Sequence, residues 1–122
     1  MSWDVRIDYP PCPTCGHERP VELDHDNYTH NCNEMLRVAL RATGTLLDRL
    51  GDRHLYALDG KLCAEIGLEL KAATDWWRDH LEELRELNPE NGWGDADSAL
   101  VFWACIADAC IAHPRAKLSL WG

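Results

Sequence analysis

The sequence predicts an α+β fold in which a small antiparallel sheet of about three strands packs against three helices. Two kinds of periodicity lead to this prediction. Apolar residues recur at every second position near both ends of the chain, and at every third or fourth position in three segments between them. The chain has 122 residues, 46% of them hydrophobic, so we expect residues 1–122 to form a single α+β domain.

Alternating patterns predict the strands. Apolar and charged residues alternate over 2–8, and two consecutive prolines end that strand. Alternation resumes over 20–26, so we expect the two strands to pair as a hairpin around a knuckle-like loop at 12–19. A third strand is expected over 117–121, where the pattern returns.

Apolar stripes predict the helices. The first begins at Asn31, which can cap it, and runs to residue 51 with an interruption at Gly44. The second covers residues 61–87 and ends before a proline. The third begins after Asp95, a favourable N-cap, and ends near residue 112.

Charge and composition exclude several classes of protein. Lysine and arginine number 12 against 21 aspartate and glutamate residues, a formal net charge of −9. A nucleic-acid polymer would require a basic face, so no such partner is expected. No apolar run is long enough to span a membrane, and no secretion signal opens the chain. We therefore expect a cytoplasmic protein with no membrane partner, whose six cysteines are free thiols.

The segment Cys12-Pro13-Thr14-Cys15-Gly16-His17 carries half of a zinc site, because such a turn points two thiolates at one ion. His17 is the nearest candidate for a third ligand. The candidate metal ligands are therefore Cys12, Cys15 and His17. The competing interpretation is a hairpin loop with two free thiols. No motif in the sequence requires a cofactor. If this loop binds one, we expect it to be a zinc ion.

Seven consecutive polar residues, 25–31, connect a strand to the start of a helix. The unpaired N–H groups at a helix N-terminus favour an anion. We therefore assign ligand-binding roles to Asn27, Thr29, His30 and Asn31. The competing interpretation is that these residues only turn the chain and cap the helix.

Trp93 lies between two glycines in the loop Asn91-Gly92-Trp93-Gly94-Asp95, also before a helix. Glycine permits unusual backbone angles and close approach, and an indole can stack on a ring or a sugar. Asn91 and Trp93 are therefore added to the ligand-binding residues, in a pocket shared with residues 25–31. The competing interpretation is that Trp93 folds back over the core.

The element Asn27-Tyr28-Thr29-His30-Asn31 with Met35, together with Asn88-Pro89-Glu90-Asn91-Gly92-Trp93-Gly94, resembles two elements of small uncharacterised proteins of actinobacteria and their phages. The resemblance spans about residues 3–120. It implies no established activity. The phage distribution of those proteins suggests a role in the contest between phage and host, by analogy with small phage proteins that sequester nucleotide immune signals.

The sequence thus predicts a non-catalytic small-molecule binding protein whose ligand is anionic and nucleotide-like. The alternative is a protein–protein interaction module, a binder or inhibitor of a host factor, with a structural zinc knuckle. A hydrolase or transferase with His25 or His30 as base ranks third, because neighbouring residues on a strand point to opposite faces and Asp24 and Asp26 cannot orient His25. Six tryptophans, with Trp76 beside a core stripe, predict a homo-oligomer, most simply a dimer.

Overall fold

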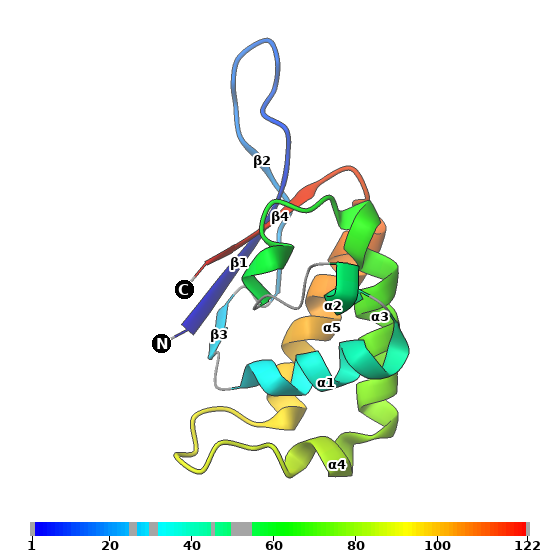
Figure 1. The fold of residues 1–122 in the computed structure, drawn as a ribbon. Coiled ribbons are helices and arrows are strands. Elements are labelled where there is room, and N and C mark those ends of the chain that lie inside the picture. The colour runs from blue at the N-terminus through cyan, green and yellow to red at the C-terminus, as the bar shows by residue number, and fades with distance from the viewer. Residues whose placement is uncertain (1, 25–26, 30–31, 45, 50–54, 122) are drawn as a thin grey trace.

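The computed structural model describes residues 2–24, 27–29, 32–44, 46–49 and 55–121. It confirms the α+β fold with a small sheet (Figure 1). The sheet lies on one side of the molecule and the helices on the other.

Every pairing in the sheet is antiparallel and involves the long first strand. The strands are β1 Ser2–Tyr9, β2 Arg19–Pro20, β3 Asn27–Thr29 and β4 Lys117–Trp121. Asp8 pairs with both Pro20 and Lys117, and Asp4 pairs with both Asn27 and Trp121. Because a strand has only two edges, β2 and β3 share one side of β1 and β4 occupies the other. The sheet is therefore three strands wide.

The predicted strand over 20–26 is wrong, because β2 ends at Pro20. The Val21 N–H still donates to the Ile7 carbonyl at 2.7 Å, and the chain then leaves the sheet. Val21 and Leu23 are partly buried against the core beside the last helix. Their alternation with Glu22 thus reflects contact with a helix rather than strand pairing. Pairing resumes in β3, within the segment expected to be a ligand-binding loop.

The three expected helices are present, and the first two are interrupted. The helical elements are α1 Asn33–Thr43, α2 Leu46–Arg49, the 3-10 turn η2 Leu55–Leu58, α3 Cys63–Asp79, α4 Leu81–Arg85 and α5 Ala96–Ala112. Gly44 separates α1 from α2, as expected, in an extended conformation. His80 separates α3 from α4 without a proline or glycine.

The two helix caps differ in how well the sequence predicted them. Asp95 caps α5 as expected, and its Oδ1 accepts from the Ser98 N–H at 2.7 Å. The expected capped start of the first helix at Asn31 is wrong, because α1 begins at Asn33 and the cap position is Cys32, whose side chain makes no cap bond. Asn31 itself lies outside the described residues.

The core lies between the sheet and the helices α1, α3 and α5. Its largest fully buried side chains include Trp77 and Phe102. Gly67 of α3 allows close contact with α5, since a Cβ there would lie 3.2 Å from the Cβ of Cys110. No helix within the described ranges could cross a bilayer.

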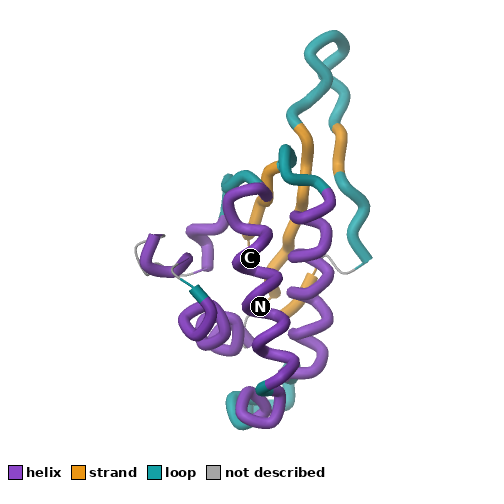
Figure 2. Tube along the Cα trace, turned by 90° about the vertical axis from the view of Figure 1, so that its right-hand side faces the viewer, coloured by secondary structure: helices purple, strands orange, loops and turns teal. Residues whose placement is uncertain are grey.

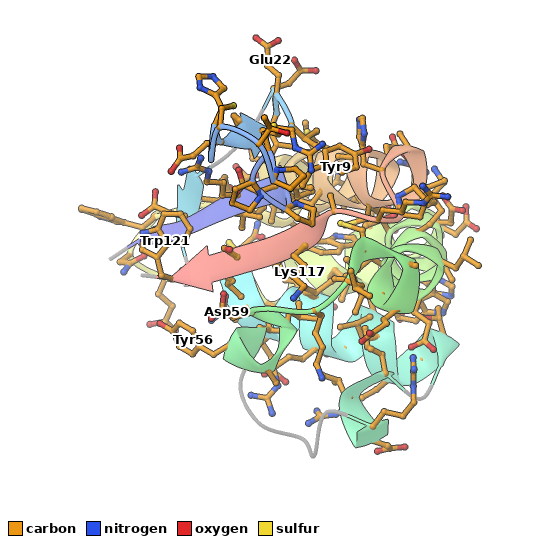
Figure 3. The ribbon with its side chains drawn as sticks, turned by 90° about the horizontal axis from the view of Figure 1, so that it is seen from above. Tyr9, Glu22, Tyr56, Asp59, Lys117 and Trp121 are labelled. Atoms are coloured by element: carbon orange, nitrogen blue, oxygen red, sulfur yellow. The ribbon has the colours of Figure 1, made fainter. Side chains whose placement is uncertain are left out.

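The outer edge of β4 is covered by the turn that precedes α3. The Gly60 N–H donates to the Leu118 carbonyl at 2.7 Å, and the Leu118 N–H donates to the Lys61 carbonyl at 2.9 Å. The Leu120 N–H donates to Oδ1 of Asp59 at 2.9 Å (Figure 3). These bonds occupy groups that an exposed edge strand would offer to another chain.

Candidate functional sites

Residues 10–18, which we call the cysteine hairpin, project beyond the sheet and the helices (Figures 1 and 2). Two backbone hydrogen bonds shape its turn: the Gly16 N–H donates to the Cys12 carbonyl at 2.8 Å, and the Cys12 N–H donates to the His17 carbonyl at 3.0 Å. Gly16 has a φ of 69°, a left-handed conformation that suits glycine. This turn holds Cys12 and Cys15 on the same loop.

The turn stabilises the Cys12 thiolate. Backbone N–H groups of Cys15 and Thr14, followed by the Cys15 thiol, lower the pKa of Cys12 to about 7. None of the six cysteines forms a disulfide. Over the described ranges, no three metal-ligating side chains come together, so the structure brings Cys12 and Cys15 onto one turn and does not complete a site with His17.

The predicted ligand residues Asn27 and Thr29 lie in β3, opposite Asp4 and Ser2. Their side chains lie outside the described part of the structure, as do His30 and Asn31. The backbone of this segment pairs with β1 instead of forming an open loop. The residue of this segment that the structure does define is Tyr28.

Tyr28 connects β3 to the start of α5. Its hydroxyl accepts from the Asp95 N–H at 3.2 Å and donates to the Asp95 carbonyl at 3.4 Å. Its ring stacks on Phe102, with centroids 5.7 Å apart. Nearby, the Cys32 thiol lies 3.9 Å from the same carbonyl, and burial raises its pKa to about 11. Through Tyr28 the first polar segment therefore lies beside Asp95, at the end of the loop 91–95, and the pocket shared by the two segments stays a prediction.

Trp93 is 64% exposed, so the interpretation that it covers the core is wrong. Its N–H donates to Oδ1 of Asn91 at 3.0 Å. Gly92 and Gly94 both have positive φ, 75° and 95°, which present the indole to solvent on a turn. Asn91 therefore supports the loop, and Trp93 is its exposed surface.

The charges around this loop do not favour an anion. The first turn of α5 carries Asp97, whose carboxylate is paired with Arg85 at 2.8 Å. That guanidinium lowers the pKa of Asp97. The N–H groups of Ala96 and Ser98 already donate to Asn88 and Asp95. The helix N-terminus thus has two of its donors occupied and carries additional negative charge.

Sequence reasoning missed a groove of about 620 Å³ between residues 21–24 and α5. Its lining combines apolar side chains with the polar groups of Glu22, Asp24, Arg78, Asp108 and His113. Leu23, Leu100, Val101 and Ala104 supply apolar surface to the groove, and Glu22 and Asp24 supply carboxylates. The alternation over 20–26, which predicts a strand, is the one signal in the sequence that could have indicated it.

The carboxylates Glu22 and Asp24 on one rim of the groove form no ion pair within the described residues. Glu22 points outward from the molecule (Figure 3). The cation Arg78 is paired with Asp75 at 3.1 Å, which reduces its effect in the groove. The groove therefore combines apolar side chains with two carboxylates, Glu22 and Asp24, that have no ion-pair partner in the part of the chain that the structure describes.

The six tryptophans are divided between the core and the surface. Trp77 and Trp103 are buried, Trp76 is partly buried, Trp93 and Trp121 are exposed, and the side chain of Trp3 is outside the described residues. Trp76 stacks on His80 with centroids 4.0 Å apart, so its own chain covers part of it.

Three features can therefore support function: the cysteine hairpin, the Trp93 loop and the groove beside α5. Each offers a distinct chemistry. The cysteine hairpin has a thiolate, the Trp93 loop has an exposed aromatic ring, and the groove has apolar side chains beside acidic groups. In comparisons with known proteins, the chain matches no protein-family model, no curated protein and no solved structure.

Proposed function

We propose that the chain is a protein-interaction module that binds a basic amphipathic segment of a partner protein in the groove beside α5. The carrying observation is that apolar side chains of the groove lie next to the carboxylates Glu22 and Asp24, which form no ion pair among the residues that the structure describes. Neither feature alone would specify a partner, but together they complement a segment with one apolar and one basic face.

The chemistry of such a complex follows from the groove. Apolar side chains of an amphipathic helix, repeating every three or four residues, would contact Leu100, Val101 and Ala104 of α5. Lysine or arginine residues along its edge would pair with Glu22 and Asp24. The formal net charge of −9 would also increase the rate of encounter with a basic partner at low salt.

The test uses a fluorescent amphipathic peptide of about 16 residues built from leucine and lysine, a length of roughly four helical turns. A second peptide of the same pattern contains glutamate in place of lysine. We expect the lysine peptide to bind with micromolar affinity by fluorescence anisotropy, more weakly as salt rises. The glutamate peptide should not bind.

Two variants locate the binding surface. Ala104→Glu, in the lining of the groove, should reduce the affinity at least tenfold. Leu68→Glu is the matched control, because Leu68 is 74% exposed on α3 and does not line the groove. An equal loss in both variants, or equal binding of the two peptides, would contradict the proposal.

Small-molecule binding is the second candidate, favoured by the exposure of Trp93 between two glycines with positive φ. In this proposal an aromatic ligand stacks on the indole, and the protein sequesters it without catalysis. Asp95 and Asp97 make a neutral ring system a better ligand than an anionic nucleotide.

Adenosine and adenosine monophosphate distinguish these possibilities. If the Trp93 loop binds a base, Trp93→Ala should abolish ligand-induced fluorescence quenching, whereas Trp121→Ala should preserve it, since Trp121 lies on β4. Tighter binding of the nucleoside would favour the neutral ligand. Tighter binding of the monophosphate would support the anionic ligand that the sequence suggested.

A further inference from the structure

We propose that two copies of this chain bind one zinc ion between their cysteine hairpins, with Cys12 and Cys15 of each copy as the four ligands. A structural zinc site is almost always tetrahedral, and four thiolates are one of its common ligand sets. One copy supplies two of them from a single turn. The site is therefore incomplete without the second copy.

The turn holds Cys12 and Cys15 on one short loop, from which a single chain can supply two thiolate ligands. The Gly16 N–H donates to the Cys12 carbonyl at 2.8 Å and the Cys12 N–H donates to the His17 carbonyl at 3.0 Å, and these bonds close the turn. Hydrogen bonds from the backbone of Cys15 and Thr14 and from the Cys15 thiol stabilise the Cys12 thiolate. Such outer hydrogen bonds orient and stabilise metal-bound thiolates. Gly16 provides the left-handed residue that closes the turn. Cys15 is exposed and Cys12 partly exposed, so an ion can approach both.

The same chain does not complete the site within its described residues, because no group of three possible metal ligands forms there. The nearby carboxylate of Glu18 is engaged by Arg6 at 2.9 Å. The segment that contains β3 joins the sheet at Ser2–Asp4, at the other end of β1. The eight residues of β1 span about 26 Å, which separates that segment from the hairpin.

A second copy is the partner that the charge distribution favours. Residues 10–20 contain one acidic and one basic residue, Glu18 and Arg19, whereas the whole chain has a net charge of −9. Two hairpin tips can therefore meet with little mutual repulsion, while the acidic bodies stay apart because the hairpin projects from them (Figure 2). A two-fold axis through the ion places identical cysteine pairs on both sides.

The binding step balances in protons and charge. Counted from fully protonated cysteines, four thiols release four protons, and the four thiolates bind one Zn²⁺ with no change in oxidation state. Binding should therefore weaken as the pH falls.

The experiment titrates ZnCl₂ into the full chain, first stripped with EDTA and kept reduced with a phosphine. Sedimentation velocity gives the mass and elemental analysis gives the zinc content. We expect a monomer in EDTA, and a dimer with one zinc ion per two chains after titration. Cobalt in place of zinc should give the absorption of a tetrahedral four-thiolate site.

Cys15→Ser should remain monomeric and lose zinc binding, with an unchanged circular dichroism spectrum. Cys105→Ser is the matched control, a partly buried cysteine of α5 outside the hairpin, and should dimerise like the parent. One zinc ion per monomer would overturn the proposal in favour of ligands within the chain. A dimer that persists in EDTA, or the absence of zinc binding, would also overturn it. If Cys15→Ser fails to fold, the mass and zinc content of the parent protein, measured in EDTA and after zinc titration, decide whether the proposal holds.

Discussion

The hydroxyl of Tyr28 makes the contact that holds β3 against α5. It satisfies the N–H of Asp95, which precedes the first turn of the helix, and it bonds the carbonyl of the same residue. Partial burial raises the pKa of Tyr28, so the hydroxyl remains protonated at neutral pH. A single phenol thus connects the sheet to the helix whose N-terminus lies beside the Trp93 loop.

Tyr28→Phe should lower the free energy of unfolding by about 1–2 kcal/mol, because the Asp95 N–H loses its partner while the ring contact with Phe102 remains. Urea denaturation would measure this loss. Tyr28→Ala should cost more, since it also removes the ring from Phe102. A change in Tyr28→Phe below about 0.3 kcal/mol would show that the two hydrogen bonds make no net contribution.

Cys12 should react with iodoacetamide at neutral pH, because the thiolate is the reactive form. A pKa of about 7 makes about half of Cys12 thiolate at pH 7, against about 1% for a thiol with the ordinary value of 9.0. Labelling of metal-free protein, followed by peptide mass spectrometry, should give a rate that falls below pH 7 and levels off above pH 8. In urea the same residue should titrate near 9; an identical profile in both states would contradict the role of the turn.

At the scale of elements, periodicity alone predicted β1, β4 and α5 well because each has one face against the core. The prediction failed at 20–26. There Val21 and Leu23 alternate with polar residues because they pack against a helix, and not because they pair with another strand. β3 has three residues, and its place in the sheet depends on pairing with Ser2–Asp4, which lies far from it in the sequence. No local pattern in the sequence can predict such a long-range contact. The break at His80 likewise has no helix-breaking residue; the His80 ring stacks on Trp76, and its Nδ1 lies 2.8 Å from the Trp76 carbonyl oxygen.

Gly67→Val should destabilise the protein by about 2 kcal/mol, because overpacking outweighs the gain in helix propensity. The added Cβ would lie 3.2 Å from the Cβ and 3.4 Å from the carbonyl carbon of Cys110, and neither atom can retreat unless α5 moves. Thermal unfolding would measure the effect. Ala64→Val, at an exposed position of α3, is the control and should change stability by less than about 0.7 kcal/mol. If both variants lost the same stability, the loss would come from placing a β-branched residue in a helix and not from overpacking against α5.

At the scale of the whole molecule, the candidate sites could be predicted only where their chemistry is local in sequence. The Cys12–Cys15 spacing and the Gly-Trp-Gly loop are local, so both sites could be found without a structure. The groove beside α5 joins residues nearly 80 positions apart, Glu22 and Val101, and only the fold brings them together. The number of zinc ligands near the hairpin is also a property of the fold, because it depends on what packs around the turn.

The cysteine hairpin lies outside the core, so its two cysteines should contribute little to the stability of the folded chain. Neither Cys12 nor Cys15 belongs to the buried core. The double variant Cys12→Ser and Cys15→Ser should therefore match the parent within about 0.5 kcal/mol by urea denaturation in EDTA.

With zinc present the two proteins should diverge. Binding that joins two folded chains stabilises them by mass action, so the midpoint of the parent should rise with protein concentration while that of the double variant stays constant. If the variant or the EDTA-treated parent were unfolded, zinc would be part of the fold of each chain. The ion would then organise the core of a single molecule, and the hairpin could not act as an independent connector between two.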